Sequence, residues 1–149
     1  MKNQLDEQLA VQLGNLLGYH IHNSDIAGEL NLIVPIPTHW WRRAKRGFHG
    51  AEIVARSVAS ACEIPYSANV LRCVRNTKKQ GTLTTAGRFR NVQNAFGLRS
   101  SHSLSGLNIM LIDDVMTSGA TLSEAARILL KAGASKVYTG VIARGARVS

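Results

Sequence analysis

The chain has 149 residues, with 18 Lys or Arg against 9 Asp or Glu, and its formal net charge is +9. Its length fits one domain, and a hydrophobic content of 45% excludes a disordered chain. The two cysteines, Cys62 and Cys73, lie far apart, which argues against a disulfide framework and against a zinc site within the chain. The N-terminus lacks a signal-peptide pattern, and no apolar window approaches the roughly 20 residues of a membrane span. We therefore expect a cytoplasmic protein without a membrane span.

The excess of basic residues predicts a partner that carries phosphate groups. Nucleic acid and a polyphosphorylated metabolite both meet this description, so the charge alone does not choose between them. One basic cluster consists of Arg42, Arg43, Lys45 and Arg46, and a looser one of Arg72, Arg75, Lys78, Lys79, Arg88 and Arg90. An ordinary solvated basic face is the alternative interpretation of either cluster.

Helical and extended patterns alternate along the first half of the chain. Leucines at helical spacing predict an amphipathic helix over residues 4–17, ended near Gly18. Residues 31–37, "NLIVPIP", predict a buried strand closed by prolines. Residues 51–62 carry an apolar helical face, and residues 69–74 predict a further strand.

The second half begins with residues 75–91, which are polar, basic and rich in Thr and Gly. They lack core periodicity, and a loop of this length inside a compact domain is usually functional or mobile. The elements expected after it are a short strand at 94–98, a continuous apolar strand at 107–113, a helix at 121–133 and a last strand at 136–143. Strands separated by helices predict an α/β fold with a largely parallel sheet in a single domain, residues 1–149.

The most informative stretch is "IMLIDDVMTSGATL", in which an apolar strand runs into Asp113 and Asp114. In an open parallel sheet, ligands bind outside the carboxyl ends of the strands. The small, hydroxyl-rich loop at 117–121 leads into a helix, whose free N–H groups and dipole favour an anion. Gly119 and Ala120 permit close backbone approach. The loop therefore predicts a phosphate cradle.

The two carboxylates need a different part of the ligand, because they repel phosphate. The hydroxyl groups of an attached sugar would serve, and so would Mg²⁺. Plain strand-to-helix turn chemistry is the alternative, but two acids followed by five small residues are uncommon in such turns. The spacing differs from that of nucleotide P-loops and of dinucleotide-binding loops. A sugar phosphate would engage both halves of the motif.

"IMLIDDVMTSGAT" resembles the phosphoribosyl-diphosphate (PRPP) signature of type I phosphoribosyltransferases. More narrowly, residues 31–144 resemble the ComF-type group, which is named for bacterial competence for DNA uptake. Three further stretches carry this closer resemblance: "PIPTHWWRRAKRGF", "RCVRNTKKQGTLTTAGRFRNVQNAF" and the terminal "VIAR". The resemblance implies a type I phosphoribosyltransferase-like fold, a largely parallel sheet flanked by helices with a flexible flap at residues 75–91.

The resemblance also implies roles for individual residues. Asp113 and Asp114 would contact the ribose hydroxyls directly or through Mg²⁺ and water. The 5′-phosphate would lie on Thr117, Ser118, Gly119, Ala120 and Thr121. Pro37 and Thr38 resemble the diphosphate loop, Lys45 and Arg46 would neutralise diphosphate, and Lys78, Lys79 and Gln80 would lie near the flap tip.

Two stretches depart from the ComF-type pattern. The group usually reads "RGFNQ", whereas this chain has His49 and Gly50 in place of Asn and Gln. Full-length members usually begin with a cysteine-rich, zinc-binding segment that is missing here, so we expect either a short natural form or a fragment. Type I relatives are often dimers, so a homodimer is one expectation for assembly.

The implied reaction displaces diphosphate from C1 of the ribose by a nitrogen base through an oxocarbenium-like transition state. Purine-type relatives carry Asp at the position of Thr117, so the sequence does not predict the acceptor base. His39, His49 and His102 are candidate proton carriers by residue type, although exposed or structural roles are commoner. Trp40 and Trp41 are candidates for stacking on a base, with packing as the alternative.

Two main functions compete. The first is an active PRPP-dependent phosphoribosyltransferase for an unidentified base. The second is a non-catalytic, PRPP-sensing or nucleic-acid-associated protein of the DNA-uptake type, with nucleic acid or a competence-machinery protein as its partner. The net charge of +9 favours this second function. A protein that bound only DNA would not need the acid pair. A phosphate-binding scaffold in a larger complex is a third, weaker idea.

Overall fold

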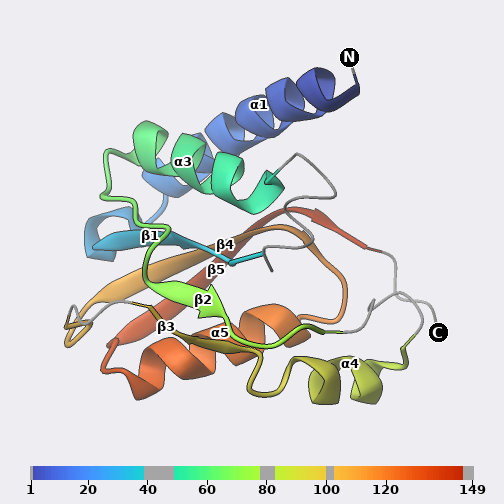
Figure 1. Ribbon diagram of the computed structural model, residues 1–149. Helices are drawn as coiled ribbons and strands as arrows, with labels where there is room; N and C mark the ends of the chain where they lie inside the picture. The colour runs from blue at the N-terminus through green and yellow to red at the C-terminus, as the bar shows by residue number, and fades with distance from the viewer. Residues whose placement is uncertain (1, 39–48, 78–82, 100–102, 146–149) are drawn as a thin grey trace.

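The computed structural model describes residues 2–38, 49–77, 83–99 and 103–145 (Figure 1). In chain order the elements are α1 (Lys2–His22), η1 (Ala27–Glu29), β1 (Leu32–Pro35), α3 (Gly50–Cys62), β2 (Leu71–Cys73), α4 (Thr85–Val92), β3 (Phe96–Leu98), β4 (Asn108–Met116), α5 (Ala120–Lys131) and β5 (Lys136–Arg144). All the predicted strands and the helices at 51–62 and 121–133 are confirmed, with ends that differ by a few residues.

Strands β1, β4 and β5 form a parallel sheet in the order β1-β4-β5, and β2 and β3 form a separate antiparallel pair. Helices α1 and α3 cover one face of the parallel sheet and α5 covers the other (Figure 1). This arrangement confirms the α/β class.

The central strand β4 is buried on both faces, as its continuous apolar run predicts. Ile109 and Leu111 pack into the core that contains α5, whereas Met110 and Ile112 pack into the core below α1 and α3. All four side chains are at most 2% exposed. Because successive side chains in a strand point to opposite faces, one apolar run supplies both cores.

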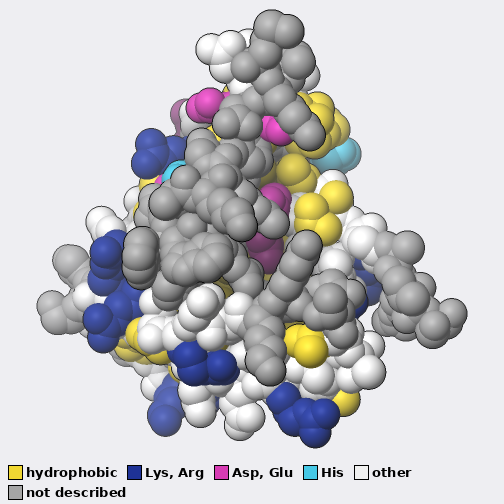
Figure 2. All heavy atoms as spheres, turned by 45° about the vertical axis from the view of Figure 1, so that its right-hand side comes forward, with side chains coloured by type: hydrophobic (Ala, Val, Ile, Leu, Met, Phe, Trp, Pro, Cys, Tyr) yellow, Lys and Arg dark blue, Asp and Glu magenta, His cyan; other side chains and the backbone are white. Residues whose placement is uncertain are grey.

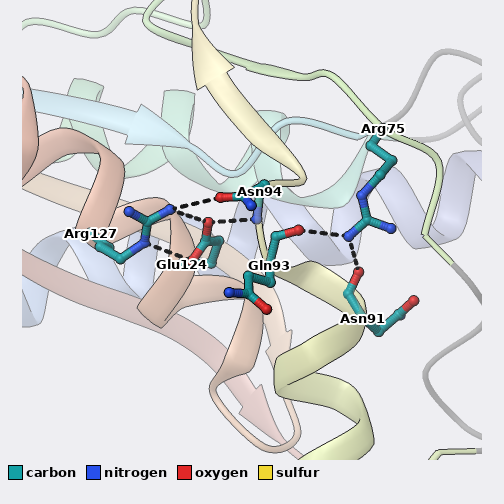
Figure 3. Close-up of polar contacts among 6 residues, drawn as sticks. All are labelled: Arg75, Asn91, Gln93, Asn94, Glu124 and Arg127. Carbon is teal, nitrogen blue, oxygen red and sulfur yellow. Dashed lines mark hydrogen bonds and ion pairs between the residues drawn. The ribbon is translucent and has the colours of Figure 1, made fainter.

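The expectation of an uninterrupted loop over residues 75–91 is wrong, because α4 occupies its second half. Thr84 caps this helix, and its side-chain oxygen accepts a hydrogen bond from the Gly87 N–H at 3.1 Å. At the other end, Arg75 Nη2 donates to the carbonyls of Asn91 and Gln93, both at 2.7 Å (Figure 3). Polar caps therefore define α4. Apolar periodicity could not reveal the helix, because Val92 is its only buried residue.

Helix α1 does not end near Gly18, as predicted, but continues to His22. Two of the leucines expected on its buried face, Leu9 and Leu16, are 54% and 55% exposed. The buried stripe consists instead of Ala10, Gly14, Gly18 and Ile21. None of the helices in the described ranges is long and apolar enough to cross a membrane.

Close packing against α3 explains why small residues line this stripe of α1. A Cβ atom added at Gly14 would lie 2.7 Å from the Cβ of Ser57, and one added at Gly18 would lie 2.6 Å from the Cβ of Ala61. Both glycines are therefore contact residues between helices. The usual association of glycine with helix ends does not apply to Gly18, because tertiary packing compensates for its low helix propensity.

We expect Gly14→Ala to destabilise the fold by about 1–3 kcal/mol, because the added methyl group must push α1 away from α3. Gly28→Ala is the matched control, since a Cβ at Gly28 would meet no atom within 4 Å. Urea unfolding monitored by circular dichroism measures both variants. A Gly14→Ala protein as stable as the Gly28→Ala protein would contradict the close packing of the two helices.

Candidate functional site

Asp113 and Asp114 lie inside β4, because that strand continues to Met116 and is not closed by the acids as expected. Its ladder with β5 extends through Met116, which pairs with Arg144. Asp113 Oδ1 accepts a hydrogen bond from the Asp114 N–H at 2.9 Å, and Asp114 Oδ1 accepts one from the Val115 N–H at 2.8 Å. Both acids nevertheless belong to the carboxyl-terminal part of the central strand, where sheet ligands bind.

Acidic side chains lie near the centre and near the top of the face in Figure 2, and most of the Lys and Arg side chains lie toward its left and lower margins. Within the acid pair, burial and then the neighbouring Asp114 carboxylate raise the pKa of Asp113 to about 7. Asp113 therefore holds a proton at pH values where an ordinary carboxyl group is ionised.

Gly50, the first residue of α3, allows the Asp114 carboxylate to approach this helix. A Cβ atom at position 50 would lie 2.6 Å from Asp114 Oδ2 and 3.2 Å from its Cγ. His49, the residue before it, makes no side-chain capping bond, and its buried Nδ1 atom has no hydrogen-bond partner among the described residues. The sequence marked this pair as a departure from the ComF-type pattern but gave no sign that Gly50 meets an acid, because the contact joins distant segments.

Gly50→Ala is expected to displace the Asp114 side chain while the fold remains, because a carboxylate can rotate whereas the helix backbone cannot easily move. The affinity for a ligand that contacts Asp114 should then fall at least tenfold. The free energy of unfolding should fall by less than about 2 kcal/mol. Ligand titration and urea unfolding of the same variant measure the two quantities. Unchanged affinity would show that the position of Asp114 is irrelevant to binding.

The loop between β4 and α5 leads into the helix through a left-handed glycine. Gly119 precedes α5 with φ = 80° and ψ = 2°, a left-handed conformation that favours glycine. The Ala120 N–H lies 3.3 Å from Ser118 Oγ, and the Gly119 carbonyl accepts the first helical hydrogen bond, from Ser123. Within the described ranges, the N–H groups of Ser118 and Gly119 have no acceptor and remain available to a ligand.

One small cavity joins the first acid to this loop. Its volume is about 30 Å³, and it is lined by Asp113, Val115, Met116, Thr117, Gly119, Ala120, Thr121 and Leu122. A space of this size holds little more than one water-sized group. A larger ligand would therefore place only one end here and would lie mostly over the loop.

Of the other residues predicted to contact PRPP, Pro37 and Thr38 lie in the described part of the chain. Pro37 is half-buried and Thr38 is exposed, directly after β1 at the same end of the sheet. Lys45, Arg46, Lys78, Lys79 and Gln80 lie outside the described residues, as do His39, His102, Trp40 and Trp41. Within the described ranges, no group of three or more His, Cys, Asp or Glu side chains could hold a metal ion.

The end of β5 also borders the loop, which the sequence did not predict. Arg144 pairs in register with Met116, and the Gly145 N–H donates to the Met116 carbonyl at 2.8 Å. A Cβ atom at Gly145 would lie 3.0 Å from Thr117 Cγ2. The backbone of Arg144 therefore lies beside Met116, which immediately precedes the 117–121 loop. The terminal "VIAR" was part of the family resemblance, but no role was attached to its arginine.

Comparison with known proteins identifies a family and relatives for this chain. The chain matches the Phosphoribosyl transferase domain family over residues 6–147. It is 29% identical over 136 residues to competence protein F of Haemophilus influenzae, covering 89% of this chain and 59% of that protein. It is 32% identical over 112 residues to DNA utilization protein YhgH of Salmonella typhi, covering 75% of this chain and 48% of that protein. The chain thus spans about half the length of these curated relatives.

Solved structures share the fold at low sequence identity. Glutamine PRPP amidotransferase from Bacillus subtilis superimposes with a TM-score of 0.60 at 19% identity, covering 91% of this chain and 26% of that one. Purine phosphoribosyltransferase from Pyrococcus horikoshii gives a TM-score of 0.56 at 16% identity, covering 95% and 74%. The chain therefore belongs to the phosphoribosyl transferase domain family, with the type I fold and with ComF-type competence and DNA-utilization proteins among its relatives.

Proposed function

We propose that this protein binds PRPP and, with Mg²⁺, transfers its phosphoribosyl group to a nitrogenous base. The observation that carries the proposal is the junction of β4 and α5. There, the N–H groups of Ser118 and Gly119 have no acceptor in the described part of the chain, and their glycine loop adjoins a cavity that Asp113 also lines. A sugar phosphate presents both a phosphate group for the loop and hydroxyl groups for the acid pair.

In the proposed complex, Ser118 and Gly119 donate their backbone N–H groups to the 5′-phosphate. The N-terminus of α5 adds the favourable end of a helix dipole. Thr117 and Thr121 line the same cavity, and their hydroxyls would orient the phosphate oxygens. Asp113 and Asp114 would then accept hydrogen bonds from the ribose hydroxyls.

The acid pair also fits a magnesium ion. Mg²⁺ prefers hard oxygen ligands and is commonly held by one or two carboxylates together with substrate phosphates and water. Burial and, after it, the neighbouring Asp114 carboxylate raise the pKa of Asp113, and a cation beside the pair would offset both effects. Mg²⁺ would supply charge stabilisation for the departing diphosphate.

Transfer itself would require positioning and electrostatics rather than a protein nucleophile. The bond between C1 of the ribose and the diphosphate oxygen breaks, and a bond from C1 to a nitrogen of the base forms. Positive charge develops on the ribose ring, next to the carboxylates. Negative charge leaves on the diphosphate, toward basic groups such as Arg144 at the end of β5 and the predicted Lys45 and Arg46.

A screen of nitrogenous bases with PRPP and Mg²⁺, monitored by diphosphate release, tests the proposal. Catalysis predicts base-dependent release with at least one acceptor, and the rate should fall when Asp113 is replaced by Asn. Diphosphate release that is equally fast without any base would indicate hydrolysis and would contradict transfer. No release, together with PRPP binding, would favour a non-catalytic PRPP sensor.

A DNA-associated role is the second candidate. Its support is the net charge of +9, the similarity to proteins named for competence and DNA utilization, and four exposed arginines, Arg72, Arg75, Arg90 and Arg99. DNA held by such residues should lose affinity steeply as salt rises, because counterions are released on binding. Tight, salt-dependent DNA binding without any response to PRPP would make this candidate the main function.

A further inference from the structure

A second cavity lies between α4 and α5 and shares no residue with the cavity at the phosphate loop. It has a volume of about 450 Å³ and is lined by Phe89, Arg90, Gln93, Asn94, Glu124 and Arg127. This volume falls in the range of small-molecule sites. None of these residues carries a role in the proposed transfer reaction.

One wall of this cavity is held rigidly by a buried carboxylate (Figure 3). Glu124 is only 9% exposed, and its Oε1 accepts a hydrogen bond from the Asn94 N–H at 2.9 Å. Arg127 pairs with the same carboxylate, through Nε to Oε2 at 3.0 Å and through Nη2 to Oε1 at 2.7 Å. Arg127 lowers the pKa of Glu124 against the opposing effect of burial, so the pair remains ionised.

Hydrogen-bond donors of two arginines in this cavity have no acceptor among the described residues. Arg127 Nη1 donates to no residue in the described ranges, where the hydrogen bonds of this side chain use only Nε and Nη2. Arg90 is exposed and likewise has no partner in that part of the chain. Since Glu124 neutralises Arg127, the positive charge of Arg90 remains in excess. The cavity is therefore suited to an anion.

An aromatic ring lies beside these donors. Phe89, on α4, is 44% exposed and lines the same cavity. Stacking of a nucleobase on an aromatic side chain contributes about 1–3 kcal/mol and requires no particular base. The side-chain amides of Gln93 and Asn94 add hydrogen-bonding groups for the ring or the sugar.

We propose that the cavity between α4 and α5 binds a nucleoside 5′-monophosphate. The base stacks on Phe89, and the phosphate is held by Arg90 and by Nη1 of Arg127. Glu124 and Asn94 fix Arg127 in place, so its guanidinium is preorganised before the ligand arrives. The site is separate from the phosphate loop, and its existence does not depend on the transfer reaction proposed above.

The experiment measures the affinity of adenosine 5′-monophosphate by isothermal titration calorimetry in a background that blocks the phosphate loop. Gly119→Asp provides this background, because it places a carboxylate in the anion cradle and Asp tolerates a left-handed backbone. Circular dichroism confirms that the variant is folded. We expect AMP to bind wild type and Gly119→Asp with affinities that agree within about threefold.

Arg90→Glu added to that background should weaken AMP at least tenfold, whereas Arg72→Glu, the same charge change at another exposed arginine, should change it less than twofold. Phe89→Leu should weaken AMP while leaving ribose 5-phosphate unchanged, because only the ring contact is lost. Binding that is lost in Gly119→Asp, or that ignores Arg90→Glu, would place the nucleotide elsewhere and overturn the proposal. So would the absence of AMP binding at millimolar concentration, or binding of a ten-nucleotide DNA strand alone.

The two proposals can fail independently. A protein that binds AMP in this way but is not stabilised by PRPP contradicts only the proposed transfer function. A protein that is stabilised by PRPP through its acids, and shows no AMP binding sensitive to Arg90, contradicts only the site between α4 and α5.

Discussion

Replacing Asp113 and Asp114 together by asparagine is expected to abolish the thermal stabilisation of this protein by PRPP and Mg²⁺. For the wild type, ligand at 100 times its dissociation constant should add about 2.7 kcal/mol of stability. For a chain of this length that corresponds to a rise in Tm of roughly 5–10 °C. The asparagines keep the size of the side chains but remove the charges that would hold the ribose hydroxyls and the metal ion. Differential scanning calorimetry measures the shift.

Two controls test whether the lost stabilisation is specific to the acid pair and to Mg²⁺. Asp6→Asn with Glu7→Gln removes an adjacent pair of exposed acids from α1 and should leave the ligand-induced shift unchanged. Removing Mg²⁺ with EDTA should reduce the wild-type shift toward that of the double variant. An undiminished shift in the Asp113 and Asp114 variant would mean that these acids do not take part in PRPP binding.

Asp113→Asn alone is expected to stabilise the ligand-free protein at pH 8 relative to the wild type, by on the order of a few kcal/mol. The pKa of Asp113 is about 7 in the folded protein and has a reference value of 3.8. The folded state therefore binds the proton more tightly than the unfolded chain. The stability that this group contributes is fully present below about pH 4 and is lost as the pH rises through about 7.

The difference in unfolding free energy between the variant and the wild type isolates Asp113 from the other titrating groups. Urea unfolding without Mg²⁺ should show a difference close to zero at pH 4 that increases up to about pH 7.5. Asparagine keeps the Oδ1 acceptor for the Asp114 N–H, so this hydrogen bond is retained. A difference that does not vary with pH would mean that Asp113 ionises like an exposed carboxyl group.

Local patterns in the sequence predict the sheet and the loop that follows β4. The apolar run at 107–113 specifies a strand buried on both faces, because a parallel sheet covered by helices must be apolar on both sides. The glycine and small residues at 117–121 likewise specify the turn into α5. In each case, neighbouring residues along the chain contain the information that determines the structure.

The features that the sequence did not predict depend on contacts between distant segments or on single capping groups. Gly18 looks like a helix-ending residue until α3 is seen packed against it, and nothing in the sequence indicates that Gly14 belongs to the same contact. The approach of Asp114 to Gly50 is also a tertiary contact. Helix α4 has a single buried residue and is defined by Thr84 and Arg75 at its ends, so hydrophobic periodicity could not reveal it.

A crystal structure with PRPP and Mg²⁺ tests the central claim most directly. We predict that the 5′-phosphate accepts hydrogen bonds from the Ser118 and Gly119 N–H groups, with the ribose hydroxyls and the metal ion next to Asp113 and Asp114. A metabolite bound elsewhere on the protein, or a phosphate loop left empty at saturating ligand, would contradict the account.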